Sequence, residues 1–266
     1  MLRTAIVTAS LALLASCAGA PQVSPAVRSE LAPTGKLRVG INFQNTLLTR
    51  KDAVTGEAGG IALDLAHELG RRLGVPVEIV PYPTAGHLAD AAKTGAWDVA
   101  FLAGEPQRAD VIAFTAPYAE IETTYLVPAG SPFRTVGDVD RDGVRIAVGA
   151  KGGPDLALSR IVKRAQIVRA PSTPASVKMF VADKLDALAG LKPQLVVNAE
   201  EIPGSRILEG RFSVVGQAVG THKGRDAGAK FLSEFVEDIK ASGLVARVVE
   251  KNGIRGLAVA PRAATQ

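Results

Sequence analysis

Residue types that support catalysis are present in this chain, but not at spacings that form a catalytic motif. The three histidines are scattered and the single cysteine is Cys17, so neither a zinc site nor a cysteine nucleophile in the body of the chain is indicated. A Gly-x-Ser-x-Gly elbow for a nucleophilic serine does not occur. The carboxylates that could serve an enzyme as acid or base are Glu105, Asp155 and Glu122. None lies in a recognisable catalytic motif, so the residues favour binding over catalysis and call for no metal or cofactor.

Cys17 is the residue with the clearest covalent chemistry. It ends the run Leu14-Ala15-Ser16-Cys17 after a short apolar stretch that carries one charge, Arg3. The stretch is shorter than the roughly 20 residues that span a bilayer, and its layout is that of an export signal. The run resembles a bacterial lipobox, which predicts a signal peptide over residues 1–16 and a lipid on Cys17. The alternative is an ordinary signal cut after Ala20, which would discard Cys17.

Composition is that of a globular chain exported without disulfides. Hydrophobic residues make up 47% and charged residues 21% of the 266, and the formal net charge is +5. No second apolar run is long enough to span a membrane, so the lipid is the only membrane attachment predicted. The positive charges form no basic block and no aromatic-rich basic segment, which argues against nucleic-acid binding. We expect a periplasmic monomer.

The elements that must position any binding residues begin near Gly35. Residues 17–34 are rich in Pro, Ala and Ser and predict an anchor followed by a flexible tether. Gly74 ends the first predicted helix. A β-α-β-α-β progression follows Gly35 and implies a mostly parallel sheet covered by helices. Its members are residues 36–41, 61–73, 77–80, 87–93 and 98–102.

A second progression with the same order predicts a second lobe. Its strands are expected at residues 144–148, 166–169 and 184–189, with helices over 155–163 and 174–182. Residues 125–128 and 213–216 are extended and apolar, and we expect them to cross between the lobes as hinge strands. The predicted boundaries are 35–123 and 217–256 for lobe 1 and 124–216 for lobe 2. The helical tail over 227–251 should pack back on lobe 1.

This layout, together with three local motifs, is similar to one family of transport proteins. The motifs are the opening Leu37-Arg38-Val39-Gly40-Ile41, the helix start Gly60-Ile61-Ala62-Leu63-Asp64-Leu65, and a block that runs from Gly95-Ala96-Trp97-Asp98 through Arg108 to Phe114-Thr115-Ala116-Pro117-Tyr118. From about Gly35 to Ile254 the chain resembles the family 3 extracellular solute-binding proteins of ABC transporters. The resemblance implies the type II periplasmic binding protein fold, two α/β lobes joined by two hinge strands that close on a solute.

Arg108 is the binding residue that the resemblance marks most clearly, because the family's matching arginine grips the ligand's α-carboxylate. A guanidinium offers a planar fork of donors suited to a carboxylate. Outside this motif the arginine would be read as an exposed surface residue. In the second lobe the family presents backbone N–H groups at a turn that opens a helix, and here that turn contains Lys151, Gly152 and Gly153.

The chain departs from the family pattern where amino acid binders have hydroxyl and acidic residues. Ala103 and Gly104 stand where hydroxyl residues are usual, and Gly190-Leu191-Lys192 replaces the aspartate that pairs with the ligand's α-ammonium. Glu105 could take over that pairing, or it could pair with Arg108 or lie in solvent. The solute is therefore either an amino acid held in an unusual way or a carboxylate without the amine.

The loop after the first strand offers further candidates. Asn42 and Asn45 could supply amide hydrogen bonds, and Phe43 a ring face, unless Phe43 is tucked into the core. Glu122, Thr123, Tyr125 and Gln217 are expected at the hinge or rim.

These features predict the extracytoplasmic solute-binding component of an ABC uptake transporter, with a permease as its partner and a small carboxylate-bearing solute as its ligand. Two alternatives stay open. Cyclohexadienyl dehydratases share the scaffold and are enzymes, and a receptor could use the same closure to signal to a sensor protein instead of a permease.

Overall fold

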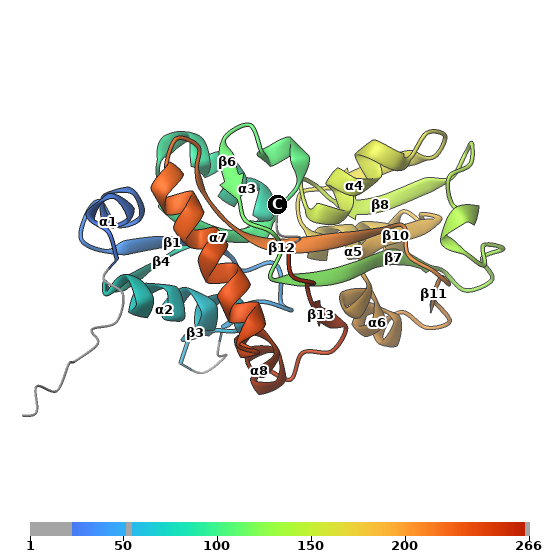
Figure 1. The fold of residues 1–266 in the computed structure, drawn as a ribbon. Coiled ribbons are helices and arrows are strands. Elements are labelled where there is room, and N and C mark those ends of the chain that lie inside the picture. The colour runs from blue at the N-terminus through green and yellow to red at the C-terminus, as the bar shows by residue number, and fades with distance from the viewer. Residues whose placement is uncertain (1–22, 52–54, 264–266) are drawn as a thin grey trace, which may run out of the picture.

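The computed structural model describes residues 23–51 and 55–263, which form two α/β lobes side by side (Figure 1). The helices are α1 (Pro25–Leu31), α2 (Ile61–Leu73), α3 (Ala85–Asp90), α4 (Gly153–Ile161), α5 (Thr173–Ala182), α6 (Lys192–Glu201), α7 (Asp226–Ala241) and α8 (Leu244–Lys251). The strands are β1 (Leu37–Asn42), β2 (Arg50–Lys51), β3 (Ala58–Gly59), β4 (Val77–Tyr82), β5 (Val99–Ala103), β6 (Ile112–Phe114), β7 (Ala119–Val127), β8 (Arg145–Gly149), β9 (Gln166–Ala170), β10 (Ala187–Leu191), β11 (Arg206–Ile207), β12 (Ser213–His222) and β13 (Leu257–Val259).

One continuous sheet runs through both lobes in the order β4-β1-β5-β12-β7-β10-β8-β9. The pairs β4-β1-β5 are parallel in lobe 1, and β10-β8-β9 are parallel in lobe 2. Between them lie two long antiparallel strands, β12 and β7, which pair with each other from Ser213↔Thr123 to Gln217↔Ala119. The predicted fold class, two mostly parallel lobes joined by two hinge strands, is confirmed. The predicted lobe boundaries at 123/124 and 216/217 fall inside these strands and stay a prediction.

The first helix of lobe 1 shows how local sequence sets an element. In α2 the residues Ile61, Leu65 and Leu69 recur at helical spacing and are fully buried against the sheet. Gly74 then adopts the left-handed conformation at φ +66°, which ends the helix as predicted. The C-terminal helix α7 packs on the same lobe through its own apolar face, which was also predicted from the tail sequence.

The segment before Gly35 differs from its prediction. Residues 17–34 were expected to be an anchor and tether, yet Pro25–Leu31 form helix α1, capped by the Ser24 side chain, which accepts the N–H of Val27. Leu31 is fully buried in the lobe 1 core, and the Glu30 carboxylate accepts the N–H of Gly228 in α7 at 2.7 Å. A short Pro-Ala-rich stretch can therefore be ordered by burial against a neighbouring helix, and a tether would be restricted to residues before α1. The predicted signal peptide and Cys17 lie outside the described residues.

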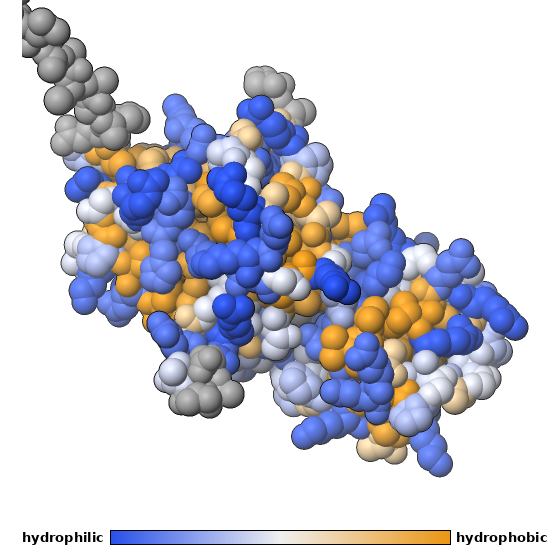
Figure 2. All heavy atoms as spheres, turned by 90° about the horizontal axis from the view of Figure 1, so that it is seen from below, coloured by the Kyte–Doolittle hydropathy of each residue, from blue (hydrophilic) through white to orange (hydrophobic). Residues whose placement is uncertain are grey.

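Helix α6 was not predicted, because apolar residues lie on its exposed face and a polar residue lies on its buried face. Its outward positions include Val196 and Val197, which are 46% and 48% exposed, whereas Asn198 is only 8% exposed. Figure 2 views the molecule from below Figure 1, and there apolar patches of moderate size alternate with polar residues over both lobes. No helix within the described ranges combines the length and apolarity needed to cross a membrane.

Candidate functional site

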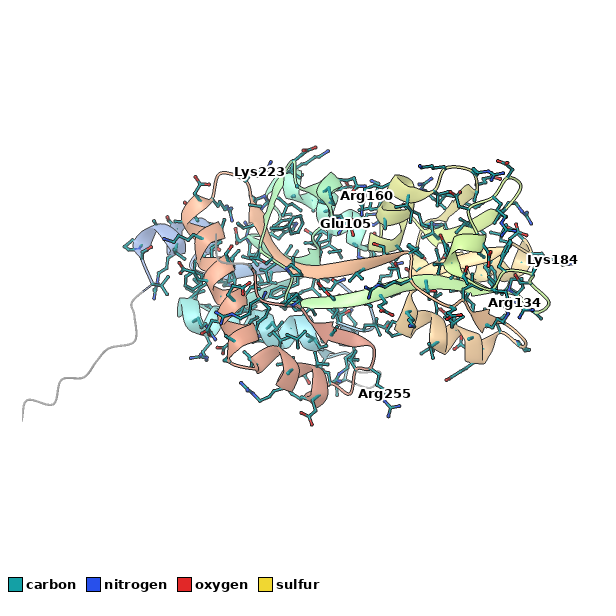
Figure 3. The ribbon with its side chains drawn as sticks, turned by 45° about the vertical axis from the view of Figure 1, so that its right-hand side comes forward. Glu105, Arg134, Arg160, Lys184, Lys223 and Arg255 are labelled. Carbon is teal, nitrogen blue, oxygen red and sulfur yellow. The ribbon has the colours of Figure 1, made fainter. Side chains whose placement is uncertain are left out.

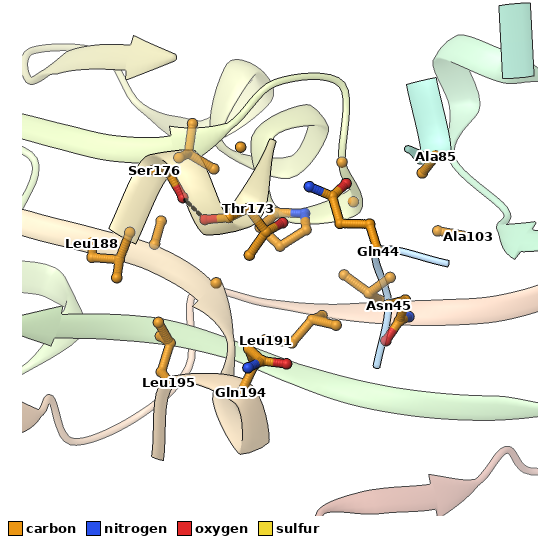
Figure 4. Close-up of a pocket in the computed structure, with 18 of the residues that line it drawn as sticks. Gln44, Asn45, Ala85, Ala103, Thr173, Ser176, Leu188, Leu191, Gln194 and Leu195 are labelled. Carbon is orange, nitrogen blue, oxygen red and sulfur yellow. Dashed lines mark hydrogen bonds between the residues drawn. The ribbon is translucent and has the colours of Figure 1, made fainter. Parts of the chain in front are cut away.

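A pocket lies between the lobes, where the carboxyl ends of parallel strands from both lobes meet (Figure 4). Ligands in α/β proteins settle at such strand ends. The empty space between its walls, counted out to the open side, is about 770 Å³. The wall consists of Asn42, Gln44, Asn45, Ala85, Ala103, Val148, Gly149, Gly152, Gly153, Pro154, Thr173, Ser176, Val177, Leu188, Ala189, Gly190, Leu191, Gln194, Leu195, Asn198, Val215 and Gln217.

The lobe 1 wall is a tight loop after β1. The side chain of Asn42 accepts the N–H of Gln44 at 3.1 Å, and that of Asn45 accepts the N–H of Leu47 at 3.3 Å. Each is an Asx turn, in which the side chain satisfies the backbone two residues ahead. The loop thus holds Gln44 between the lobes (Figure 4), where its Nε2 is buried and has no hydrogen-bond acceptor among the described residues.

The opposite wall in lobe 2 is the turn between β8 and α4. Lys151 has a positive φ of 56°, and its N–H is accepted by the Asp155 carboxylate at 2.8 Å. This turn places Gly152 and Gly153 in the pocket wall, and the N–H of Gly153, the first residue of α4, meets no acceptor within the described residues. Glycine suits this place because a Cβ on Gly153 would lie 2.8 Å from Cγ1 of Val215. The first turn of α4 therefore presents the free N–H of Gly153 and the positive end of the helix dipole.

The lobe 2 end of the pocket, here called the recess, is lined by residues of β10, α5 and α6. Val177, Leu188 and Leu195 supply apolar walls. The hydroxyl of Ser176 is satisfied, since it donates to the Thr173 carbonyl at 2.8 Å. Asn198 also lines this space, and its Oδ1 is buried with no partner among the described residues.

Contacts between the lobes close the pocket at its rim. Arg160 of α4 donates to the Glu105 carboxylate at 2.8 Å and to Gln107 Oε1 at 2.9 Å; Figure 3 labels Glu105 and Arg160 at this junction. Lys151 Nζ lies 2.7 Å from Asp90 Oδ2. Across the pocket, Thr46 donates to Gln194 at 2.7 Å. The structure is therefore a closed arrangement of the two lobes.

Arg108 does not line the pocket. Its side chain is buried, with Nη1 donating to the Ala103 carbonyl at 2.7 Å and Nη2 to the Lys151 carbonyl at 2.8 Å. Burial disfavours the charged form and lowers the pKa of Arg108 to about 10, so the guanidinium is still charged at neutral pH. It ties the end of β5 in lobe 1 to the α4 turn in lobe 2, directly behind the pocket wall.

Four of the predicted binding residues, Asn42, Asn45, Gly152 and Gly153, lie in the pocket wall. Five others lie elsewhere for identifiable reasons, so the structure does not bring them to the pocket as expected. Besides Arg108, Phe43 packs against the lobe 1 core with Lys51 Nζ 5.3 Å from its ring centre. Gly104 donates its N–H to Gly216. Glu105 and Lys151 are engaged in the rim ion pairs with Arg160 and Asp90.

Sequence reasoning missed several polar wall residues, namely Gln44, Thr173, Ser176, Gln194 and Asn198, and placed Gln217 at the hinge or rim. Gln44 lies in the loop after the first strand, between the predicted residues Asn42 and Asn45. A signal was available for Thr173 and Ser176, because the run Ser172-Thr173-Pro174 after a strand is typical of a helix start facing a ligand. No local signal marks Asn198, since only the packing of α6 turns it inward.

The pocket wall, as far as the chain is described, contains no Asp, Glu, His, Lys, Arg, Tyr or Cys. The carboxylates considered for catalysis are held elsewhere by cations. Asp155 pairs with Arg169 at 2.8 Å, and Glu122 pairs with Lys192 and Arg211 at 2.9 Å each. Hydrogen bonds from Lys192 and then Arg211 lower the pKa of Glu122. Over the described ranges no group of three or more His, Cys, Asp or Glu side chains is placed to hold a metal ion.

Solved structures with the same fold are numerous. The L-arginine-bound substrate-binding protein AbpA of an amino acid ABC transporter from Streptococcus pneumoniae is 19% identical, with a TM-score of 0.71 over 85% of this chain and 98% of that one. Holo ArgBP from T. maritima is 23% identical, with a TM-score of 0.68 over 84% and 98%. The ancestral amino acid-binding protein AncCDT-1, a precursor of cyclohexadienyl dehydratase, is 23% identical, with a TM-score of 0.71 over 84% and 98%.

At these identities the structural similarity shows the shared fold alone. No curated protein sequence matches the chain. The sequence model of one family, however, matches residues 37–253, which span both lobes and the pocket between them. The chain therefore belongs to the bacterial extracellular solute-binding proteins, family 3.

Proposed function

We propose that this protein is the extracytoplasmic solute-binding component of an ABC uptake transporter and closes its lobes on a small carboxylate-bearing solute, an amino acid or a related organic acid. Membership of the solute-binding family supports the binding role. Structural neighbours that are described as amino acid ABC transporter proteins support the ligand class and a permease as the partner.

The observation that carries the carboxylate proposal is a set of unused donors around one pocket. Gln44 Nε2 on the lobe 1 side and the amide of Gly153 on the lobe 2 side have no acceptor among the described residues. Buried donors without acceptors are costly, and a ligand that accepts from both lobes removes that cost only when the lobes are closed. A carboxylate has enough acceptor sites to serve both donors, and the N-terminus of α4 favours its negative charge.

In this proposal Arg108 acts from behind the wall. Its positive charge favours an anion at the neighbouring glycine amides, and its two carbonyl contacts hold Ala103 and the α4 turn in position. Direct contact between Arg108 and the solute, as the family resemblance implies, would use guanidinium N–H groups other than the two given to the carbonyls of Ala103 and Lys151. Either route makes Arg108 important for affinity.

A dehydratase activity is the second candidate, because AncCDT-1 is described as a precursor of such an enzyme. General acid or base catalysis needs a titratable group within hydrogen-bond reach of the substrate. The absence of any such side chain from the described pocket wall supports binding instead.

The family's extracellular location agrees with export, and we propose in addition that the mature protein is a monomer anchored by a lipid on Cys17. Mass spectrometry of the N-terminal peptide from membranes checks this. A lipid-modified Cys17 is expected, and an unmodified N-terminus after Ala20 would refute it.

The ligand proposal is tested by a thermal-shift screen against amino acids, dicarboxylates, aromatic acids and opines, together with prephenate. A solute at about 100 times its dissociation constant should add roughly 2.7 kcal/mol to the free energy of unfolding. We expect a carboxylate-bearing hit that is weakened in Arg108→Ala. A hit that this variant binds as tightly as the unaltered protein would refute carboxylate recognition at this place, and turnover of prephenate would establish the enzyme.

A further inference from the structure

The recess at the lobe 2 end of the pocket combines an apolar wall with one unsatisfied polar atom. Asn198 is 8% exposed and its Oδ1 has no hydrogen-bond partner among the described residues. Its neighbours in the recess, Val177, Leu188 and Leu195, belong to the apolar layer between the sheet and helices α5 and α6. An acceptor buried in such a layer is costly unless something donates to it.

The pattern along α6 shows that Asn198 is not there merely to cover the helix. Leu195 and Asn198 are three residues apart and share the buried face, whereas the exposed face carries Val196 and Val197. An apolar residue at position 198 would pack against Leu195 at no polar cost. The asparagine is therefore explained by something outside the protein that pairs with its side-chain amide.

The recess also defines what that partner can be. The described wall offers no charged side chain, and the Ser176 hydroxyl already donates its hydrogen bond to the Thr173 carbonyl. An ammonium, guanidinium or carboxylate placed there would be buried without a counter-ion, which is strongly unfavourable. A purely apolar group would fill the space but leave Oδ1 of Asn198 unpaired.

We propose that this recess is the side-chain subsite of the pocket and that it selects an uncharged ligand side chain with an apolar stem and a terminal N–H or O–H donor. A carboxamide is the best match, because its N–H can donate to Oδ1 while its carbonyl accepts from Nδ2 of Asn198. This inference rests on the proposed function, since it takes the rest of the ligand to be held by Gln44 and the amide of Gly153.

The test compares ligands of similar size that differ in the end of the side chain. Isothermal titration calorimetry of the purified protein is carried out with L-glutamine, L-methionine, L-glutamate and L-lysine. We expect L-glutamine to bind about tenfold more tightly than L-methionine, which is the effect of one buried hydrogen bond, and the two charged amino acids to bind more weakly than either.

The variant Asn198→Leu keeps the branched shape of the side chain and removes the amide. It should weaken the binding of L-glutamine by about tenfold and leave the binding of L-methionine unchanged or make it tighter. Glu201→Gln, an exposed change on the same helix, is the matched control and should alter neither affinity. A circular dichroism melt of each variant shows that the fold is retained.

The possible failures are distinguishable. The subsite would be overturned if L-lysine or L-glutamate bound most tightly. It would also be overturned if Asn198→Leu lost the same factor of affinity for L-glutamine and for L-methionine. Either result would leave the proposed solute-binding function intact. Absence of binding to all four amino acids, and to every carboxylate in the thermal-shift screen, would overturn the proposed function and the subsite together.

Discussion

The ion pair between Glu105 and Arg160 should help to hold the lobes closed. The Glu105 side chain is 7% exposed and the Arg160 side chain 40% exposed, and the two meet at 2.8 Å across the lobes. The two partners therefore differ in how much they depend on the ion pair, because only Arg160 can be solvated by water in the closed form. Replacing Arg160 by glutamine leaves a buried carboxylate without its cation, whereas replacing Glu105 leaves an exposed guanidinium that water and Gln107 can still serve.

The size of the effect follows from this asymmetry. Removing one partner of a fully buried pair costs about 3–5 kcal/mol, but Arg160 is partly exposed and its charge is screened, so about 1–2 kcal/mol is the reasonable expectation. Glu105 regains water if the lobes separate. The cost therefore acts on the equilibrium between closed and open forms, which should shift toward open by about 5- to 30-fold. Glu105→Gln should shift it by less than about 1 kcal/mol.

The opening can be measured by electron spin resonance between two spin labels. Because Cys17 is the only cysteine of the chain, Cys17→Ser with Lys93→Cys and Lys163→Cys places one label on each lobe, both at exposed positions. The distance distribution of the ligand-free protein should gain a longer component in Arg160→Gln, and much less of it in Glu105→Gln. The double variant should lie closer to Glu105→Gln than to Arg160→Gln, because it has no buried charge.

Two results would contradict this reasoning. Equal opening in the two single variants would mean that burial of Glu105 does not determine the cost. Unchanged distances in all variants, together with a lower unfolding free energy in Arg160→Gln, would mean that the pair stabilises the folded chain and not lobe closure.

Further predictions concern the body of the protein. Leu31→Ala should lower the free energy of unfolding by about 2–5 kcal/mol because Leu31 is fully buried. The control Ser29→Ala, on the exposed side of α1, should change this free energy little. Similar urea midpoints for the two variants would show that α1 is dispensable for stability. Gly70→Ala should destabilise by about 1–3 kcal/mol, since a Cβ there would lie 2.3 Å from Val77 Cγ2, and a raised melting temperature would contradict the packing. Hydrogen bonding from Arg71 lowers the pKa of Glu68 from 4.5 to about 2. The ionised carboxylate therefore stabilises the fold above about pH 4.5, and this contribution is lost as the pH falls toward 2. The difference in unfolding free energy between the unaltered protein and Glu68→Gln should shrink over this interval.

Much of the architecture was predictable because it depends on local periodicity. The apolar spacing in Ile61–Leu73 and the terminating Gly74 predicted α2, and alternating strand and helix patterns predicted two parallel lobes. The polar and glycine-rich loops after the strands predicted that Asn42, Asn45, Gly152 and Gly153 would line the pocket. These positions follow from chain order, since strand ends in parallel sheets gather at one edge.

The direction of individual side chains was not predictable in the same way. Arg108 and Glu105 were correctly placed in the loop after β5, but their partners, the Lys151 carbonyl and Arg160, lie 43 and 55 residues away in the other lobe. Whether an arginine points to a solute or to a carbonyl depends on how two separately folded lobes meet. The same holds for α1, whose Pro- and Ala-rich sequence indicates a helix only when α7 covers it.

The sequence by itself determined the family, the two-lobed sheet and the loops that form the pocket, because these follow from residue order, hydrophobic period and turn chemistry. Only the tertiary structure decided which polar groups are left without partners. Gln44 Nε2, the amide of Gly153 and Asn198 Oδ1 lie in three different segments, and each could have been satisfied by a neighbour. Whether a polar group finds a hydrogen-bond partner depends on how the segments pack together. The groups available to a ligand can therefore be identified only in the closed arrangement of the lobes.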